Sequence, residues 1–214
     1  MAVFSSMSRR PLLPEDGFLR FVIDVLVNSV VIIALFFFVQ KVIAAPFQVI
    51  GNSMHDTLHD GEYIVVSKLE YLFGEPQRGD IVVFHPPHHT DEYYIKRIIG
   101  IPGDKVELKG GQVYVNGNLV EEAYLQEGLK TCLVAHMRNC EDDERVYEIP
   151  EGKYFVLGDN RTGSSDSRAW YDADNKPDPF VDLDQIQGKT RVVLYPLPEI
   201  RLIQETHVFD EVGN

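Results

Sequence analysis

The most apolar part of the chain is residues 21–45, FVIDVLVNSVVIIALFFFVQKVIAA. Its core, residues 29–39, carries no charge, and only Asp24 and Asn28 interrupt the residues before it. A helix needs about 20 such residues to cross a bilayer. Asp24 would lie near one interface, and the ammonium group of Lys41 can extend to the other. We therefore predict one N-terminal transmembrane helix over residues 21–45.

Three arginines precede this run: Arg9, Arg10 and Arg20. The positive-inside rule then predicts a short cytoplasmic stub, residues 1–20, and an extracytoplasmic body, residues 46–214, in a single-pass protein of the plasma membrane. Two alternatives remain. The small residues Ala44 and Ala45 would suit a cleavable signal peptide, although the run is long for one. A buried helix of a soluble domain is the other, although the run has no amphipathic stripe.

After residue 45 the pattern changes to short β-branched and aromatic runs separated by Gly, Pro and Asp. Asn116-Gly117, between two such runs, indicates a two-residue hairpin. Regularly spaced short strands predict a mostly β body, either a barrel or a sandwich. The polar residues 121–148 resemble an insertion, and the acidic residues 172–184 a solvent loop. The predicted strands are residues 63–66, 81–84, 93–99, 106–108, 113–115, 154–157 and 191–195.

The chain has 214 residues, of which 44% are hydrophobic and 25% charged. This composition indicates one folded domain with a short appendage rather than a disordered chain. The formal net charge of -13 argues against nucleic acid as a partner, because phosphate binding needs clustered Lys and Arg. The same charge disfavours adhesion to an anionic lipid surface, so attachment to a bilayer would be hydrophobic.

The two cysteines, Cys132 and Cys140, lie in one polar stretch. Together with His136 they do not complete a four-ligand zinc pattern. A disulfide suits a location outside the cytoplasm, and two free thiols are the alternative. A further group of histidines lies in a proline-broken loop and is interpreted as surface residues: His85, His88 and His89. A metal site there is the alternative, and it would need ligands that the loop does not obviously offer. We expect neither a metal nor another cofactor.

Two residues could form a nucleophile and base. Ser53 follows the apolar run in GNSMHDTL, although a serine beside Gly and Asn is commonly a turn residue. On a strand through residues 93–104, Tyr94, Lys96 and Ile98 share one face. If that face is buried, the pKa of Lys96 falls; a shift from about 10.4 to about 8 costs roughly 3 kcal/mol. The alternative is a solvated lysine.

Two further segments have distinctive patterns. Residues 158–168, GDNRTGSSDSR, are dense in hydrogen-bonding groups and follow an apolar strand, which indicates either a tight turn or a site. Within them, Asp166 and Arg168 are close enough to form a salt bridge. Residues 78–84, RGDIVVF, indicate a turn that leads into a buried strand.

These segments resemble, in order, the boxes of the bacterial type I signal peptidases, a family of serine peptidases with a Ser–Lys dyad. The resemblance covers about residues 21–198. Its two most specific boxes are residues 94–104 and 158–168. It implies a β-rich catalytic core with a smaller β extension, placed here at residues 105–148. It also implies catalysis without a metal or cofactor.

The resemblance assigns roles to individual residues. Ser53 matches the nucleophile and Lys96 the general base. Ser164 matches a serine that hydrogen-bonds and orients this lysine, and Tyr94 matches a residue packed beside it.

Three further residues match supporting positions. Asp166 and Arg168 match a structural pair below the site, and Met54 matches a residue that lines the substrate groove. The sequence departs from the family where proline is common and this chain has Asp56. Some members also place a serine, as an oxyanion donor, where this chain has Gly51; the backbone N–H of Ser53 would then serve.

The implied partners are secretory preproteins and the lipid bilayer. Cleavage would follow small residues of the Ala-x-Ala type and pass through an acyl-enzyme. Two alternatives are a Ser–Lys peptidase dedicated to one pilus or conjugation protein, and a catalytically silent membrane-anchored binding protein. The apolar run and the lack of a DNA-binding module exclude soluble repressor-type autoproteases.

Overall fold

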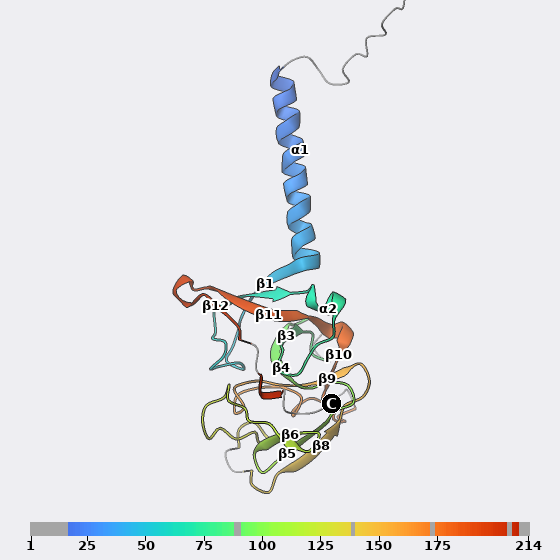
Figure 1. Cartoon of the computed structure of the whole chain (residues 1–214), viewed down its shortest axis with the longest axis vertical. Coiled ribbons are helices and arrows are strands. Elements are labelled where there is room, and N and C mark those ends of the chain that lie inside the picture. Colours follow the sequence, from blue (N-terminus) through green and yellow to red (C-terminus); the bar gives the residue numbers. More distant parts are fainter. Residues whose placement is uncertain (1–16, 88–90, 138–139, 172–173, 205–206, 210–214) are drawn as a thin grey trace, which may run out of the picture. The chain divides into compact units, whose positions relative to one another are not determined.

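The computed structural model describes residues 17–87, 91–137, 140–171, 174–204 and 207–209 (Figure 1). The chain divides into two compact units, Met1–Lys41 and Val42–Asn214. The first contains one long α-helix, and strands make up most of the regular secondary structure of the second. The prediction of a mostly β body preceded by one N-terminal apolar helix is therefore confirmed.

The helix α1 spans Gly17–Phe38 and continues into a short π-helix, η1, at Val39–Ile43. By length and composition, Gly17–Lys41 is able to cross a membrane, and a signal sequence near an N-terminus would pass the same test. No residue of α1 is buried, so the alternative of a buried helix was wrong.

The helix also ends earlier than expected. Ala44 and Ala45 belong to the first strand rather than to the helix. Pro46 follows them, and proline disfavours the helical conformation of the residue before it and supplies no N–H group.

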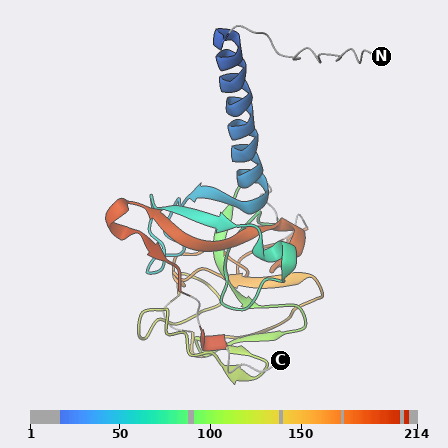
Figure 2. The same ribbon diagram turned by 45° about the horizontal axis from the view of Figure 1, so that its top comes forward.

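The larger sheet is antiparallel and runs in the order β1-β2-β11-β3-β4-β9-β10, with β12 paired to β11. Figure 2 shows β11 as a long strand that crosses the body. A short helix, α2, spans Glu70–Phe73. The strands are β1 (Ala44–Gln48), β2 (Tyr63–Ser67), β3 (Ile81–Phe84), β4 (Tyr94–Gly100), β9 (Lys153–Leu157), β10 (Phe180–Asp182), β11 (Ile186–Tyr195) and β12 (Arg201–Leu202).

The smaller sheet has the order β7-β6-β5-β8 and lies at the opposite end of this unit from β1 and β11 (Figure 1). Asn116 and Gly117 have φ values of 52° and 82°, as a two-residue hairpin turn requires, so the predicted hairpin is confirmed. The strands are β5 (Lys105–Lys109), β6 (Gln112–Val115), β7 (Asn118–Leu119) and β8 (Glu144–Glu148). All four lie within residues 105–148.

A solvent loop was expected over residues 172–184, but this segment contains the strand β10. Val181 on this strand is fully buried and explains the pairing with β9. The part of the chain that the structure describes also contains three short 3-10 helices: η2 (Leu183–Gln185), η3 (Leu197–Glu199) and η4 (His207–Phe209).

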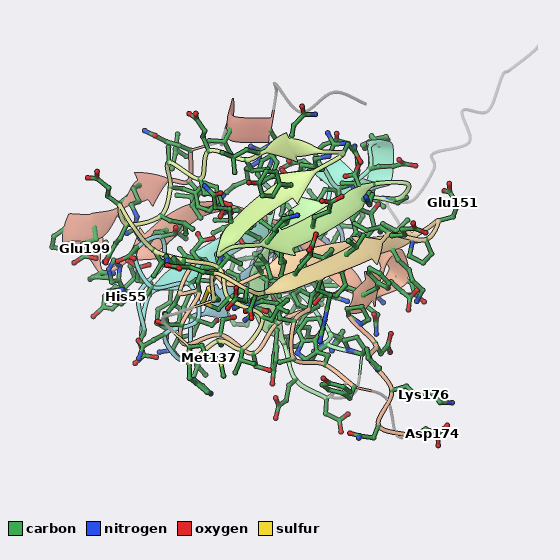
Figure 3. All side chains as sticks on the ribbon, turned by 90° about the horizontal axis from the view of Figure 1, so that it is seen from below. His55, Met137, Glu151, Asp174, Lys176 and Glu199 are labelled. Carbon is green, nitrogen blue, oxygen red and sulfur yellow. A yellow bond between two sulfur atoms is a disulfide. The ribbon has the colours of Figure 1, made fainter. Side chains whose placement is uncertain are left out.

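Apolar side chains form three buried clusters, one between β5, β6, β8 and β9 and two around the larger sheet. Charged side chains such as Glu151, Asp174 and Lys176 point away from this unit (Figure 3). Several charged residues are nevertheless buried, and most of them belong to the segments singled out from the sequence: Asp80, Lys96, Arg97, Asp104, Asp159, Arg161, Asp166 and Arg168.

Candidate active site

The two predicted dyad residues lie side by side. Lys96 Nζ is 2.9 Å from Ser53 Oγ and 2.9 Å from the carbonyl oxygen of Ile95. Ser53 lies in the turn between β1 and β2, and Lys96 lies on β4. The sheet therefore brings together two residues that are 43 positions apart.

The turn is held by its buried apolar residues. Met54 and Leu58 are 1% and 0% exposed and pack in one of the clusters around the larger sheet. The N–H of Leu58 donates to the carbonyl of Met54 at 2.8 Å. Met54 was expected to line the substrate groove, and this was wrong: its unbranched side chain fills the core beneath Ser53.

Lys96 is 3% exposed, and burial lowers the pKa of its amine to about 8. The negative charges of Asp166 and Asp159 act in the opposite direction but do not cancel the effect of burial. Its Nζ lies 5.2 Å from the centre of the Tyr94 ring, as the shared strand face predicted. At a pKa of about 8, roughly a tenth of the molecules carry a neutral Lys96 at pH 7.

Ser164 lies near the dyad but does not hydrogen-bond to Lys96, contrary to expectation. Its hydroxyl is buried and has no hydrogen-bond partner among the described residues. It packs against Gly158, where an added Cβ would lie 2.2 Å from Ser164 Oγ and 2.5 Å from the carbonyl oxygen of Ser53. Glycine at this position therefore permits the close approach of residues 158–168 to the turn that carries Ser53.

The expected ion pair between Asp166 and Arg168 is confirmed. Arg168 Nε and Nη2 each donate to a different carboxylate oxygen at 2.8 Å, and both side chains are buried. Asp166 also accepts the N–H of Gly158 at 3.0 Å. Burial alone would raise the pKa of Asp166, but the Arg168 guanidinium holds it below its ordinary value.

A second buried ion pair was missed from the sequence. Arg97 donates to both carboxylate oxygens of Asp159 at 2.9 and 2.7 Å, and neither side chain is more than 2% exposed. Asp159 also accepts the hydroxyl of Thr57 at 2.5 Å. Arg97 follows Lys96 and points to the other face of the strand. Two adjacent cations in an otherwise apolar strand were the available sequence signal, because one on each face implies that each needs a partner.

The same loop also hydrogen-bonds to the backbone of the turn that carries Ser53. The N–H of Asn160 donates to the carbonyl of Ser53 at 3.1 Å, and its side-chain amide donates to the carbonyl of Asn52 at 2.9 Å. Together with the Thr57 contact, these bonds fix the turn that carries Ser53 against residues 158–168.

The remaining box also contributes an ion pair. Arg78 donates to both carboxylate oxygens of Asp104 at 2.7 and 2.6 Å. This pair joins the segment before β3 to the turn after β4 and so fixes the end of the strand that carries Lys96.

A groove of ≈ 640 Å³ contains both dyad residues. One of its walls is β1, the edge strand of the larger sheet. One side of β1 pairs with β2, and among the described residues the sheet order places no strand on the other side. Ser165 lines the groove, whereas Ser164 does not. The lining residues are Phe47, Gln48, Val49, Ile50, Ser53, Ile64, Val83, Glu92, Tyr93, Tyr94, Ile95, Lys96 and Ser165.

Asp56 occupies the position where proline is common in the resembled family, and its φ is 85°. Proline is restricted to a φ near −65°, so it cannot adopt this backbone. The Asp56 carboxylate lies 3.0 Å from His55 Nδ1 and accepts the side-chain amide of Gln126 at 2.9 Å. The turn at Asp56 therefore has a conformation that proline cannot adopt, and the contact with Gln126 ties it to residues 121–148.

Cys132 and Cys140 form a disulfide, which decides between the two alternatives left open by the sequence. They also lie near Asp143, but sulfurs bonded to each other are not thiolate ligands. In another cluster, His59, Glu62 and Glu199, the buried Glu62 already accepts Arg201 at 2.7 and 3.0 Å. His88 and His89 lie outside the described residues.

The model of the family "Signal peptidase, peptidase S26" matches residues 22–195. The chain belongs to this family. Signal peptidase IB of Staphylococcus aureus (strain COL) is 38% identical over 189 residues, 84% of this chain and 93% of its own length. Signal peptidase I S of Bacillus subtilis (strain 168) is 40% identical over 172 residues, 80% of this chain and 88% of its own length.

Among solved structures, a signal peptidase I from Enterococcus faecalis V583 is 29% identical and has a TM-score of 0.41. The match covers 54% of this chain and 97% of that one. As a member of the signal peptidase family, the chain is a peptidase. Ser53 and Lys96 are the residues whose catalytic roles are to be tested.

Proposed function

We propose that this chain is a signal peptidase I that removes signal peptides from secretory preproteins, with Ser53 as nucleophile and Lys96 as general base. One observation carries the proposal: a buried lysine with a lowered pKa lies 2.9 Å from the hydroxyl of a serine that lines the same groove. Family membership supports the reaction class, and this distance supports the choice of the two residues.

Neutral Lys96 takes the proton of Ser53 while Oγ bonds to the scissile carbonyl carbon. The resulting oxyanion needs a donor, and among the described residues the backbone N–H of Ser53 has no acceptor of its own. The N–H of Gly51 is already used by Asp60 Oδ1 at 2.7 Å. As the C–N bond breaks, the Lys96 ammonium protonates the leaving amine. Lys96 then activates water, which releases the acyl group.

The substrate would bind as an added strand. The outer edge of β1 is available for main-chain pairing, and Phe47 and Gln48 at its end line the groove together with Val49, the next residue. The apolar walls near Ser53, including Ile64 and Val83, suit small side chains next to the scissile bond. This arrangement supports cleavage after small residues of the Ala-x-Ala type.

Membrane anchoring is supported by the apolar helix Gly17–Lys41. The proposed orientation has residues 1–20 in the cytoplasm and residues 46–214 outside it, in the plasma membrane. A protease added to the cytoplasmic side of sealed vesicles should leave the catalytic unit intact. Digestion of that unit would reverse the orientation.

The proposal is tested by incubating the purified full-length chain with a panel of preproteins and sequencing the product N-termini. Cleavage of many preproteins after small residues is expected, and Ser53→Ala should abolish it. Cleavage of one pilus or conjugation precursor alone would favour a dedicated maturation peptidase. No cleavage, together with no labelling of Ser53 by an acylating inhibitor, would favour a silent binding protein.

A further inference from the structure

The segment that follows β7 contacts the active-site loop through a buried ion pair. Arg161 is 0% exposed, and its two terminal nitrogens donate to the carboxylate of Glu122 at 2.6 and 2.5 Å. The hydroxyl of Thr131 accepts the same guanidinium. Arg161 Nε donates to the carbonyl of Gly158 at 3.1 Å, and Gly158 is the residue packed against Ser53. Two residues, Arg161 and Gly158, thus connect Glu122 to the nucleophile.

The same segment contacts the strand of the general base. The ring of Tyr124 lies 4.0 Å from the guanidinium carbon of Arg97, which follows Lys96 on β4. The Tyr124 hydroxyl donates to Glu122 at 2.6 Å and accepts Arg161 Nη2 at 3.2 Å. Tyr124 therefore touches two buried arginines from two catalytic segments, a cation–π contact on one side and a hydrogen bond on the other.

Two more contacts extend the pattern along the segment. The side-chain amide of Gln126 donates to the carboxylate of Asp56, three positions after Ser53, at 2.9 Å. At the other end, the carbonyl of Cys132 accepts Arg168 Nη1 at 2.9 Å. Residues 122–132 thereby reach the nucleophile turn, the β4 strand and the 158–168 loop.

We infer that residues 122–132 form a positioning strap that aligns the three catalytic segments, and that Glu122 is its principal positioning residue, acting through Arg161. The inference rests on the proposed function. None of the strap residues lines the groove, so the strap acts on alignment and not on substrate contact. Without the Glu122 carboxylate, the buried guanidinium of Arg161 would lose its bidentate partner and its hold on the Gly158 carbonyl would loosen.

The test compares Glu122→Gln, which keeps the shape and removes the charge, with the full-length wild-type chain on a preprotein. We expect kcat to fall at least 10-fold with KM within about 2-fold, since misplacing a catalytic group by about 1 Å can cost 10²-fold. Glu122→Asp should recover part of kcat. Glu144→Gln is the matched control, because it removes an exposed carboxylate of the same extension, paired with Lys109 at 2.9 Å, and should retain wild-type kcat.

A second readout separates the strap from the proposed function. The rate at which an acylating inhibitor labels Ser53 does not depend on the preprotein, and it should fall in Glu122→Gln with kcat. If the wild type labels but cleaves no preprotein, the proposed function is rejected while the labelling rates still decide the inference. A wild-type labelling rate in Glu122→Gln, or the same loss in Glu144→Gln, would overturn it.

If Glu122→Gln does not fold, Tyr124→Phe replaces it. This change removes only the hydroxyl that joins Glu122 to Arg161 and keeps the ring on Arg97. A loss of about 3- to 10-fold in kcat is expected, in line with one misaligned contact. Wild-type kcat in Tyr124→Phe would reject the strap as a positioning element.

Discussion

Lys96 Nζ lies 2.9 Å from Ser53 Oγ, and the same lysine is 3% exposed. The distance allows proton transfer, and the burial makes the neutral amine accessible near neutral pH. The β4 strand supplies both properties, because its pairing with β3 and β9 buries the lysine while its register points Nζ to the turn after β1.

Removing either dyad residue should abolish catalysis. Ser53→Ala and Lys96→Ala are each expected to abolish preprotein cleavage, because one lacks the nucleophile and the other the base. Lys96→Arg should fail as well, because a guanidinium stays protonated. Product formation is measured by gel and N-terminal sequencing, with circular dichroism as the folding control. Cleavage by any of the three folded variants would refute the assignment.

Turnover should rise with pH through a midpoint of about 8, the pKa of buried Lys96. The sign follows from the chemistry: protonated Lys96 cannot accept the serine proton, so the rate is lost as pH falls. The measurement is kcat from about pH 6 to pH 10 on a peptide spanning a small-residue cleavage site. A midpoint near the ordinary lysine value would mean that Lys96 is hydrated in the working enzyme.

The same shift predicts a pH dependence of stability. Burial lowers the pKa of Lys96 from 10.5 to about 8, so the unfolded chain binds the extra proton between these values. The free energy of unfolding contributed by Lys96 therefore rises as pH increases from about 8 to 10.5, by up to about 3 kcal/mol.

Lys96→Met should remove this contribution and be more stable than wild type at pH 7. Denaturant unfolding of both chains at several pH values measures the difference between their free energies of unfolding. The contributions of other titrating groups are common to both chains and cancel in this difference. A difference in free energy of unfolding between Lys96→Met and wild type that is the same at pH 7 and at the alkaline end of the range would contradict the prediction.

Gly158→Ala should inactivate the protein. The added methyl would lie 2.5 Å from the Ser53 carbonyl oxygen and 2.2 Å from Ser164 Oγ, closer than packed atoms allow. We expect kcat to fall by about 100-fold or more, as for other displaced catalytic groups. Adding Ser164→Gly removes one of the two clashes and should restore only part of the rate. Full activity in Gly158→Ala would show that the two segments can separate.

Asp56→Pro should be harmful even though proline is common there in the family. The φ of 85° at Asp56 excludes proline, and glycine adopts it freely. We expect Asp56→Pro to lower the free energy of unfolding by more than about 1 kcal/mol and to reduce cleavage, whereas Asp56→Gly stays within about 1 kcal/mol of wild type. Thermal unfolding and kcat are the measurements. A stable, active Asp56→Pro would show that the turn rearranges.

The sequence pattern predicted what depends on local periodicity. The short apolar runs became strands, Asn116-Gly117 became a hairpin, and alternation along β4 put Lys96 on one face with Tyr94. The helix end was misplaced, because Ala44 and Ala45 are compatible with either conformation and pairing with β2 decided it. Local propensity does not report such tertiary choices.

What depends on long-range packing was not predictable. The burial of Met54 needs the core beneath the turn, and the Arg97–Asp159 pair joins residues 62 positions apart. The contacts of Glu122 and Gln126 arise in a segment whose polar, irregular pattern indicated only an insertion. Buried polar networks carry no periodic signal, because each member is specified by its partner rather than by its neighbours in sequence.

The edge position of β1 has a consequence for substrate breadth. An added strand is held through peptide groups, and every polypeptide presents the same peptide groups whatever its side chains. An enzyme that binds the substrate backbone and contacts the side chains of only the few residues beside Ser53 can accept exported proteins that share little sequence. Selection on its preprotein substrates then acts on a few positions near the cleavage site, and the rest of each signal peptide is free to diverge.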